Sequence, residues 1–319
     1  MTALTPELLG SAEPVLLRGL VNDWPLVQAA RRSDAAFCAY LREFGRDAKV
    51  GLWRGAPAIE GRFFYSDDFK GFNFQAEIRG LDALLDELLA GSADALYLGS
   101  TELEGTFPGL RAQHPLAALD ARTPRANLWL GNRIRVAPHF DLPDNLACVV
   151  AGRRRFTLFP PEQVRNLYIG PLDLTPAGQP ISLVDTQRPD FARFPRYAQA
   201  QEAARVFELE PGDALFIPSQ WWHGVEGLDG LNGLVNFWWR QSPAYMDTPL
   251  NTLMLALLSL RDLPPAQRDA WRALFDHFVF DADAETAAHI PEGARGVLGP
   301  LDEARARQLR AVLLNRLNR

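Results

Sequence analysis

Short runs of β-forming residues, separated by turn residues, dominate the sequence between about residues 93 and 240. The runs are ALYLG, NLWLGNRIRV, NLACVV and RFTLF, followed after residue 204 by RVFELE, ALFIP and LNGLVNFWWR. Many short strands with Gly and Pro turns are typical of an all-β barrel or a double-sheet jelly roll. We therefore expect a mainly β core over about 93–240.

Helical and mixed patterns flank this core. Before residue 93, two runs favour strands (14–20 and 49–55), and two have apolar residues at helical spacing (33–44 and 81–89). After residue 243, helices are expected near Pro265 and from about Leu301. The predicted organisation is thus a domain over 1–243, with an α/β N-terminal region, and a C-terminal helical region over 244–319.

A long, proline-rich segment interrupts the strand pattern between residues 161 and 204. Loops of this length inside a domain are usually functional or act as a cover. We expect this segment and the N-terminal region to shape the specificity of any site in the β core.

Composition narrows the classes of protein. The 319 residues carry a net charge of −6, which disfavours a general nucleic-acid binder. Two cysteines, Cys38 and Cys148, form no disulfide framework, and the N-terminus has no secretory pattern. The longest apolar run, residues 250–260, is too short to cross a membrane. We expect a soluble, cytoplasmic protein without a membrane segment.

Two of the five histidines stand in contexts that favour chemistry. His277 has the position of an ordinary helix residue, and His114 and His289 lie near prolines and are expected at the surface. His139 stands two residues before Asp141, so both side chains point to the same face of an extended strand. His223 follows a turn and an apolar strand, which could bring it to the same site.

Two histidines and one carboxylate on one side of an ion are the ligand set of non-haem Fe(II) oxygenases. A closed zinc site would need a fourth ligand, and no cysteine is close in sequence. From the residues alone an alternative stays open, in which His139 and Asp141 form a hydrogen-bonded pair and His223 is packed in the core.

One arginine of the triplet 153–155 is expected to point inward. Arg154 shares a strand face with Phe156 and Leu158, whereas Arg153 and Arg155 share the polar face. A buried guanidinium needs an anion or many hydrogen bonds, although an arginine at a strand end can also reach water. Since no lysine follows Lys70, any cation that binds an anion in this core must be an arginine.

An asparagine interrupts the last apolar strand in the same way. Asn236 shares a face with Leu234 and Trp238, and a buried amide needs partners. Those partners can be backbone groups or a ligand, and the pattern does not choose between them. Trp221, Trp222 and Trp238 could form apolar walls, although core packing is the more common role of tryptophan.

Four ordered motifs carry a resemblance to a known family. GNRIRVAPHFD, GRRRFTLFPPEQ, ELEPGDALFIPSQWWHGVE and LVNFWW together resemble the cupin-like branch of the JmjC oxygenases, a group related to the asparaginyl hydroxylase of hypoxia-inducible factor. The resemblance covers about residues 14–239. It implies a double-stranded β-helix fold that uses Fe(II), 2-oxoglutarate and O2.

The resemblance also implies roles for individual residues. His139, Asp141 and His223 would be the catalytic iron ligands. Asn145 and Asn236 match positions near the 2-oxoglutarate carboxylate that chelates iron, and Tyr97 matches a tyrosine at the distal carboxylate. Two positions depart from the asparaginyl hydroxylase: Arg154 replaces its lysine and Val136 its threonine. An altered cosubstrate pose, or a different 2-oxo acid, is therefore open.

The function implied is an Fe(II)- and 2-oxoglutarate-dependent dioxygenase, a hydroxylase of a protein side chain or a small molecule. The alternatives are a non-catalytic metal-binding cupin that serves in interactions, and a metal-dependent cupin enzyme that does not use 2-oxoglutarate. The acidic charge disfavours RNA as a substrate. The C-terminal helices match a region that dimerises in relatives, so a homodimer is expected.

Overall fold

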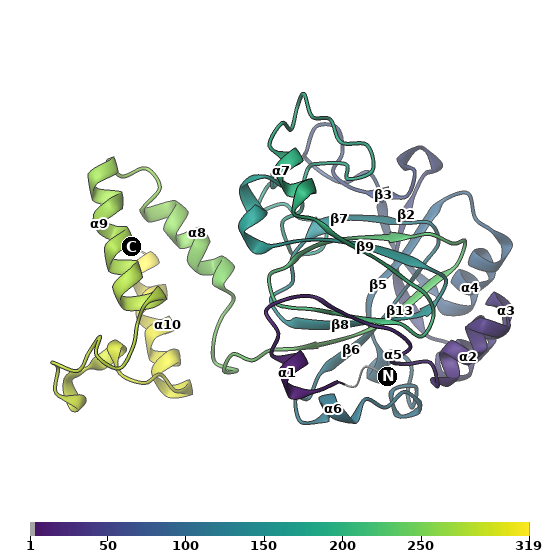
Figure 1. Cartoon of the computed structure of the whole chain (residues 1–319), viewed down its shortest axis with the longest axis horizontal. Coiled ribbons are helices and arrows are strands. Elements are labelled where there is room, and N and C mark those ends of the chain that lie inside the picture. Colours follow the sequence, from purple (N-terminus) through teal and green to yellow (C-terminus); the bar gives the residue numbers. More distant parts are fainter. Residues whose placement is uncertain (1–3, 319) are drawn as a thin grey trace. The chain divides into compact units, whose positions relative to one another are not determined.

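The structure, a computed structural model, describes residues 4–318 (Figure 1). The described residues divide into two compact units, with the division between Gln241 and Ser242. The first unit contains the strands and the second is helical. Each unit is considered by itself below.

Two sheets form the core of the first unit. The large sheet runs in the order β1 (Val15–Leu17), β11 (Ala214–Ile217), β8 (Asp144–Ala151), β13 (Asn232–Trp239), β6 (Arg125–Gly131), β5 (Ala95–Glu102), β2 (Lys49–Gly55) and β4 (Gln75–Gly80). The small sheet runs β10 (Arg205–Leu209), β9 (Arg154–Phe159), β12 (Trp222–Gly227), β7 (Arg135–His139) and β3 (Arg62–Phe63). Only the pairing of β3 with β7 is parallel.

From β6 to β9 the chain alternates between the two sheets, as a jelly roll requires. The sheets pack face to face through alternate apolar side chains of their strands. Ala147, Val149 and Leu234 of the large sheet meet Phe156 and Leu158 of the small one. The predicted β core with flanking helices is therefore confirmed.

Helices of the N-terminal region cover the outer face of the large sheet (Figure 1). They are α2 (Pro25–Arg32), α3 (Asp34–Phe44) and α4 (Leu81–Ala90). Ser33 caps α3 by accepting a hydrogen bond from the Ala36 amide at 3.0 Å. Both helices predicted from apolar spacing are confirmed, but the strand expected over 14–20 is limited to Val15–Leu17.

The remaining elements of this unit are short. They are the helices α1 (Pro6–Leu9), α5 (Leu103–Thr106), α6 (Ala117–Asp120) and α7 (Tyr197–Glu202), and the 3-10 turns η1 (Pro57–Ile59), η2 (Arg111–Gln113) and η3 (Pro161–Arg165).

The run NLWLGNRIRV is one unit in the sequence but two strands in two sheets. The chain turns at Asn132, whose side chain accepts from the Leu96 amide at 3.0 Å and donates to the Asp94 carbonyl at 2.7 Å. These bonds replace strand pairing at the corner. A side chain at Gly131 would come within 2.5 Å of the Leu96 carbonyl oxygen, so the corner also needs a glycine there.

The surface position expected for His114 is wrong. Only 1% of His114 is exposed, and it lies beside Trp24 and Tyr40. Its Nδ1 contacts the Leu110 carbonyl at 2.7 Å, and its Nε2 accepts from the Leu26 amide at 3.2 Å. Burial lowers the pKa of His114, so the ring stays neutral. Its two contacts link α2 to the loop that contains Leu110 and His114.

Part of the long segment 161–204 is attached to the small sheet. Ile181 forms a bridge with His139 at the end of β7, and the Ser182 amide donates to the Pro138 carbonyl at 2.7 Å. Further along, Arg135 pairs with Asp185 at 3.1 Å. These contacts hold residues 176–181 beside the end of β7.

The second unit consists of α8 (Pro249–Ser259), α9 (Pro265–Phe275), the π-helical turn η4 (Asp276–Phe280), the 3-10 turns η5 (Glu292–Ala294) and η6 (Gly296–Leu298), and α10 (Glu303–Leu317). Thr248 caps α8 and Asp302 caps α10 through their side chains. Within residues 4–318, every helix is too short or too polar to span a bilayer.

Candidate metal centre and adjoining cavities

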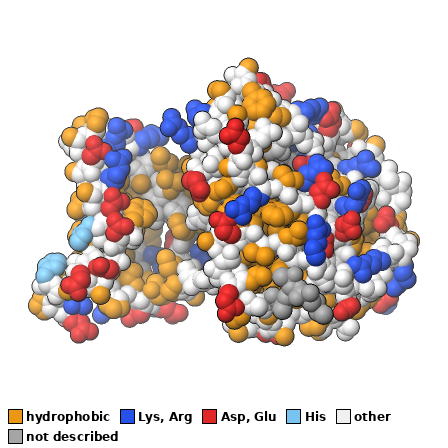
Figure 2. Space-filling model, in the orientation of Figure 1, with side chains coloured by type: hydrophobic (Ala, Val, Ile, Leu, Met, Phe, Trp, Pro, Cys, Tyr) orange, Lys and Arg blue, Asp and Glu red, His pale blue; other side chains and the backbone are white. Residues whose placement is uncertain are grey.

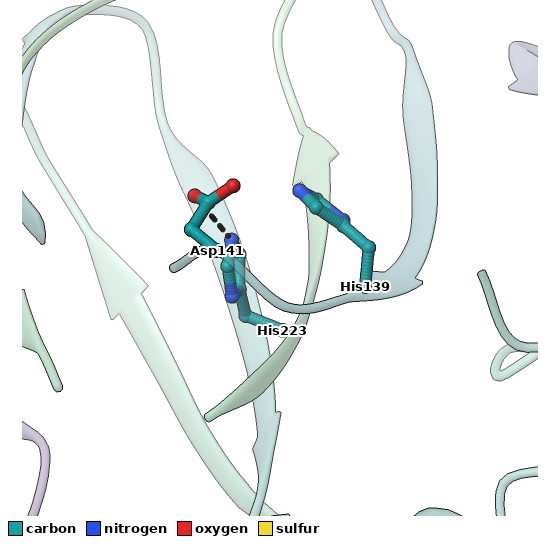
Figure 3. Close-up of side chains that lie close together, drawn as sticks. All are labelled: His139, Asp141 and His223. Carbon is teal, nitrogen blue, oxygen red and sulfur yellow. Dashed lines mark ion pairs between the residues drawn. The ribbon is translucent and has the colours of Figure 1, made fainter. Parts of the chain in front are cut away.

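His139, Asp141 and His223 lie close together (Figure 3). The two histidines belong to strands of the small sheet, and Asp141 belongs to the turn that follows β7. His139 ends β7 and lies opposite His223 of β12 in the antiparallel register. Asp141 follows two residues later, and its carboxylate lies 3.6 Å from His223 Nε2. One possible ligand atom from each of the three residues lies within 4.8 Å of the others.

Backbone carbonyls orient both imidazole rings. His139 Nδ1 lies 3.0 Å from the Ala137 carbonyl, and His223 Nδ1 lies 2.9 Å from the Trp221 carbonyl. Because a carbonyl only accepts, each Nδ1 carries the proton and each Nε2 presents its lone pair when the ring is neutral. Such carbonyl contacts are typical of histidines that bind metal ions.

The ionisation of these side chains suits a cation. Burial, with the adjacent His223, lowers the pKa of His139 to about 4. Burial alone would raise the pKa of Asp141, but the neighbouring imidazoles, His223 above all, hold it below its usual value. A neutral imidazole and an ionised carboxylate are the forms that metal ions bind.

The chemistry of this donor set fits a ferrous ion. Two imidazole nitrogens and one carboxylate oxygen match the facial triad of non-haem iron sites. Among residues 4–318, no fourth His, Cys, Asp or Glu joins the group. A closed zinc site is therefore not favoured.

A small cavity of about 40 Å³ between the sheets adjoins the three residues. It is lined by the four residues expected near the cosubstrate, Tyr97, Asn145, Arg154 and Asn236, as well as by Val136. Tyr97 comes from β5, Asn145 from β8, Arg154 from β9 and Asn236 from β13. The fold thus places them around one space beside the candidate metal centre.

Arg154 is the unusual member of this cavity. Only 1% of it is exposed, and its Nη2 makes two long contacts of 3.4 Å, to the carbonyls of Trp129 and Asn232. Its Nε has no partner, and within the described part of the chain no carboxylate pairs with it. Burial lowers the pKa of Arg154 to about 10. Such an unpaired cation is costly, and an anion in the cavity would relieve the cost.

Asn236 and Asn145 belong to one network of side-chain amides. Asn236 Nδ2 donates to Asn145 Oδ1 at 3.1 Å. Asn236 Oδ1 accepts from Trp129 Nε1 at 2.8 Å and from Asn127 Nδ2 at 3.4 Å. The partners of Asn236 are therefore side chains that hold the amides of the cavity in fixed orientations.

A second, larger cavity of about 630 Å³ also reaches His139 and Asp141. Most of the residues that line it could not be predicted from the sequence. Trp53, Phe63 and Trp129 come from β2, β3 and β6, and Gln179 comes from the long segment. Strand alternation could have identified Trp129, because it shares a strand face with Asn127. It could not have identified Trp53, Phe63 and Gln179, which reach the cavity only through contacts between distant segments.

Of the three tryptophans considered as walls, only Trp238 lines the two cavities. Trp221 and Trp222 are buried in separate apolar clusters. The segment 161–204 does contribute a wall, through Pro176, Ala177, Gln179 and Ile181.

The sequence matches the family described as "Cupin-like domain" over residues 2–245. It is 34% identical over 137 residues to Lysine-specific demethylase JMJ31 of Arabidopsis thaliana, which covers 41% of this chain and 24% of the relative. It is 32% identical over 218 residues to tRNA wybutosine-synthesizing protein 5 of Danio rerio, and this match covers 60% of this chain and 64% of the relative. It is 27% identical over 242 residues to Lysine-specific demethylase 8 of Danio rerio, and this match covers 73% of this chain and 54% of the relative.

These matches span between about a quarter and just under two thirds of the length of the curated relatives. They agree with the cupin-like resemblance of the motifs. The closer likeness to the asparaginyl hydroxylase stays a prediction.

Proposed function

This chain belongs to the cupin-like domain family, and on that premise we propose that it is an Fe(II)- and 2-oxoglutarate-dependent dioxygenase that hydroxylates its substrate. One observation carries the proposal. A buried arginine without an anionic partner, Arg154, lines the same cavity as a His-Asp-His group suited to Fe(II). In this proposal the dianionic cosubstrate occupies that cavity, where its distal carboxylate pairs with Arg154.

Each residue has a stated part in this proposal. His139, Asp141 and His223 hold Fe(II) on one side and leave its other positions for ligands. When bound, the iron with O2 and 2-oxoglutarate supplies the oxidation, in which the 2-oxo acid is converted to succinate and CO2. Arg154 binds the distal carboxylate of the cosubstrate, and its two-donor guanidinium suits a carboxylate.

The other residues orient the cosubstrate and exclude water. Tyr97 lines the same cavity as Arg154 and lies close enough to interact with its charge, so its hydroxyl would donate to the distal carboxylate. Asn145 and Asn236, whose amides are joined by a hydrogen bond, line the same cavity and would contact the carboxylate that chelates iron. Val136 adds no hydrogen bond, so Arg154 carries more of the binding than in relatives with a threonine there.

A cosubstrate assay tests the function. Purified protein with Fe(II) is expected to bind 2-oxoglutarate in anaerobic calorimetry, and with ascorbate and O2 to release succinate. Binding without turnover on any substrate would favour a non-catalytic cupin. No binding of 2-oxoglutarate, with a tightly held metal, would contradict the oxygenase and favour a cupin enzyme of another kind.

Among substrates we propose a protein side chain or a small molecule rather than RNA. Acidic and basic side chains are interspersed over the face of the first unit in Figure 2, and the net charge is −6. RNA binding usually needs a continuous basic surface. Since Cys38 and Cys148 are buried free thiols, we also propose a reducing, cytoplasmic location.

We propose a homodimer formed through the C-terminal helices. Apolar side chains are exposed on α9, η4 and α10, among them Trp271, Phe280 and Leu314. Removal of residues 263–319 is expected to yield monomers in sedimentation velocity, whereas the full chain sediments as a dimer. Dimers that persist in the shortened chain would contradict this interface.

A further inference from the structure

We infer that the large cavity takes an uncharged, apolar or aromatic group of the substrate, and that Gly51 keeps the space for this group open. The inference rests on the proposed function, because it treats the cavity as the path of the substrate to the metal. It adds a class of substrate group and a residue that determines specificity.

The large cavity is continuous with the candidate metal centre. His139 and Asp141 line both it and the small cavity, and Tyr97, Trp129 and Trp238 also border both spaces. Its volume of about 630 Å³ lies in the range of pockets that bind small molecules. A group bound there would lie beside His139 and Asp141, whereas Arg154 lines only the small cavity.

Aromatic rings form the inner walls of this cavity. Trp53 meets Tyr97 edge to face, with ring centroids 5.7 Å apart, and Tyr97 stacks on Trp129 at 6.1 Å. Phe63 packs against both Trp53 and Tyr97. Rings that support one another in this way present rigid apolar surfaces, which favour an apolar or flat partner.

The walls offer no counter-ion to a charged group. Among the described residues that line the large cavity there is no Arg or Lys, and the carboxylates are Asp141 and Glu77. Asp141 belongs to the metal group. Glu77 accepts from Arg54 at 3.2 Å and alternates along β4 with Ala76 and Ile78, so its side chain points to the other face. A charged group would lose its hydration here without compensation.

Gly51 is exposed and lines the rim of the large cavity, beside the exposed Ile78. It lies opposite Ile78 in the β2–β4 pairing and two residues from Trp53, so a side chain at this position would share their face. A Cβ added at Gly51 would meet no atom within 4 Å. The Gly51→Leu change therefore narrows the cavity without a clash.

Gly80 provides a matched control on the same pair of strands. It lies opposite Lys49, at the end of β4, and does not line the cavity. A Cβ there also meets nothing within 4 Å. Gly80→Leu thus adds the same side chain to the same pair of strands outside the cavity.

Three probes of one shape and different charge test the inference. They are 3-phenylpropanol, 3-phenylpropylamine and 3-phenylpropionate, which are neutral, cationic and anionic at neutral pH. Their affinities for the full chain, without metal or 2-oxoglutarate, are measured by saturation-transfer NMR. Only the binding that Gly51→Leu removes is assigned to the large cavity, because the carboxylate can also enter the Arg154 cavity.

The neutral probe is expected to bind the large cavity about tenfold or more tightly than either charged probe. Gly51→Leu is expected to weaken its binding about tenfold, and Gly80→Leu to leave it unchanged. Tighter binding of the amine would show that the cavity accepts a cation, through its rings or through the Asp141 carboxylate, and would overturn the inference. So would equal binding by all three probes, no binding at millimolar concentration, or neutral binding that Gly51→Leu does not change.

The outcome is separable from that of the proposed function. The probe assay contains no metal and no cosubstrate, whereas the calorimetric assay contains no substrate probe. Failure of 2-oxoglutarate to bind would remove the oxygenase proposal and leave the probe result intact. Failure of the probe test would remove only the substrate class and the role of Gly51.

Discussion

Replacing Asp141 with alanine is expected to weaken binding of Fe(II) by at least about a hundredfold, since even residues that only orient metal ligands contribute 10- to 100-fold. Asp141 is the anionic member of the three-residue group, and two neutral imidazoles alone hold a hard divalent cation weakly. Metal content after dialysis, and the rise in melting temperature on adding Fe(II) without O2, measure the loss.

Two further variants make this result specific. Asp141→Asn keeps the shape of the side chain and removes its charge, so it is expected to behave like the alanine variant while retaining the fold. Asp229→Asn removes a carboxylate that pairs with Arg153 outside the cavities, and it is expected to bind Fe(II) normally. An Asp141→Ala protein that retains stoichiometric iron would refute the ligand assignment.

Replacing Arg154 with methionine is expected to act in opposite directions on stability and on cosubstrate binding. Methionine fills most of the space of the arginine stem and removes a buried charge without an anionic partner. Replacement of buried charges by apolar side chains can stabilise a protein by about 1–4 kcal/mol. The melting temperature of the protein without cosubstrate is therefore expected to rise.

The same variant is expected to raise the half-saturating concentration of 2-oxoglutarate about tenfold or more. A charge-assisted hydrogen bond contributes about 1.5–3 kcal/mol, and about 1.4 kcal/mol corresponds to a factor of ten. Arg155→Met, one residue along β9 on its other face, is the control, because Arg155 pairs with Glu208 outside the cavity. Unchanged melting and unchanged half-saturation in Arg154→Met would remove this arginine from the cosubstrate site.

Local sequence patterns were sufficient for most of the β core. Alternation of polar and apolar residues predicted that Arg154 points inward between its two polar neighbours, and the structure buries it. The separation of His139 and Asp141 by two positions predicted that their side chains lie on one side of the chain, and these side chains do lie close together. The inference for Arg154 succeeds because strand geometry determines which neighbours share a face. β7 ends at His139, so Asp141 reaches the site from the turn that follows the strand.

Features that depend on contacts between residues far apart in the chain could not be predicted from local sequence patterns. The turn at Asn132 depends on bonds to the backbone of β5, some 36 residues earlier, so the run around it looked like one strand. His114 seemed to belong to the surface because its partner on α2 lies 88 residues away. The large cavity likewise combines separate strands with the segment 176–181.

The register between β7 and β12 has a consequence for the folding of the protein during its synthesis on the ribosome. His139 and His223 face each other across this pairing, yet 82 residues separate Asp141 from His223 in the chain. Contacts so distant in sequence form late in folding. On the proposed function, a nascent chain that has emerged only as far as β9 lacks one of the three metal ligands. The proposed iron could therefore bind tightly only after β12 has left the exit tunnel and docked between β7 and β9.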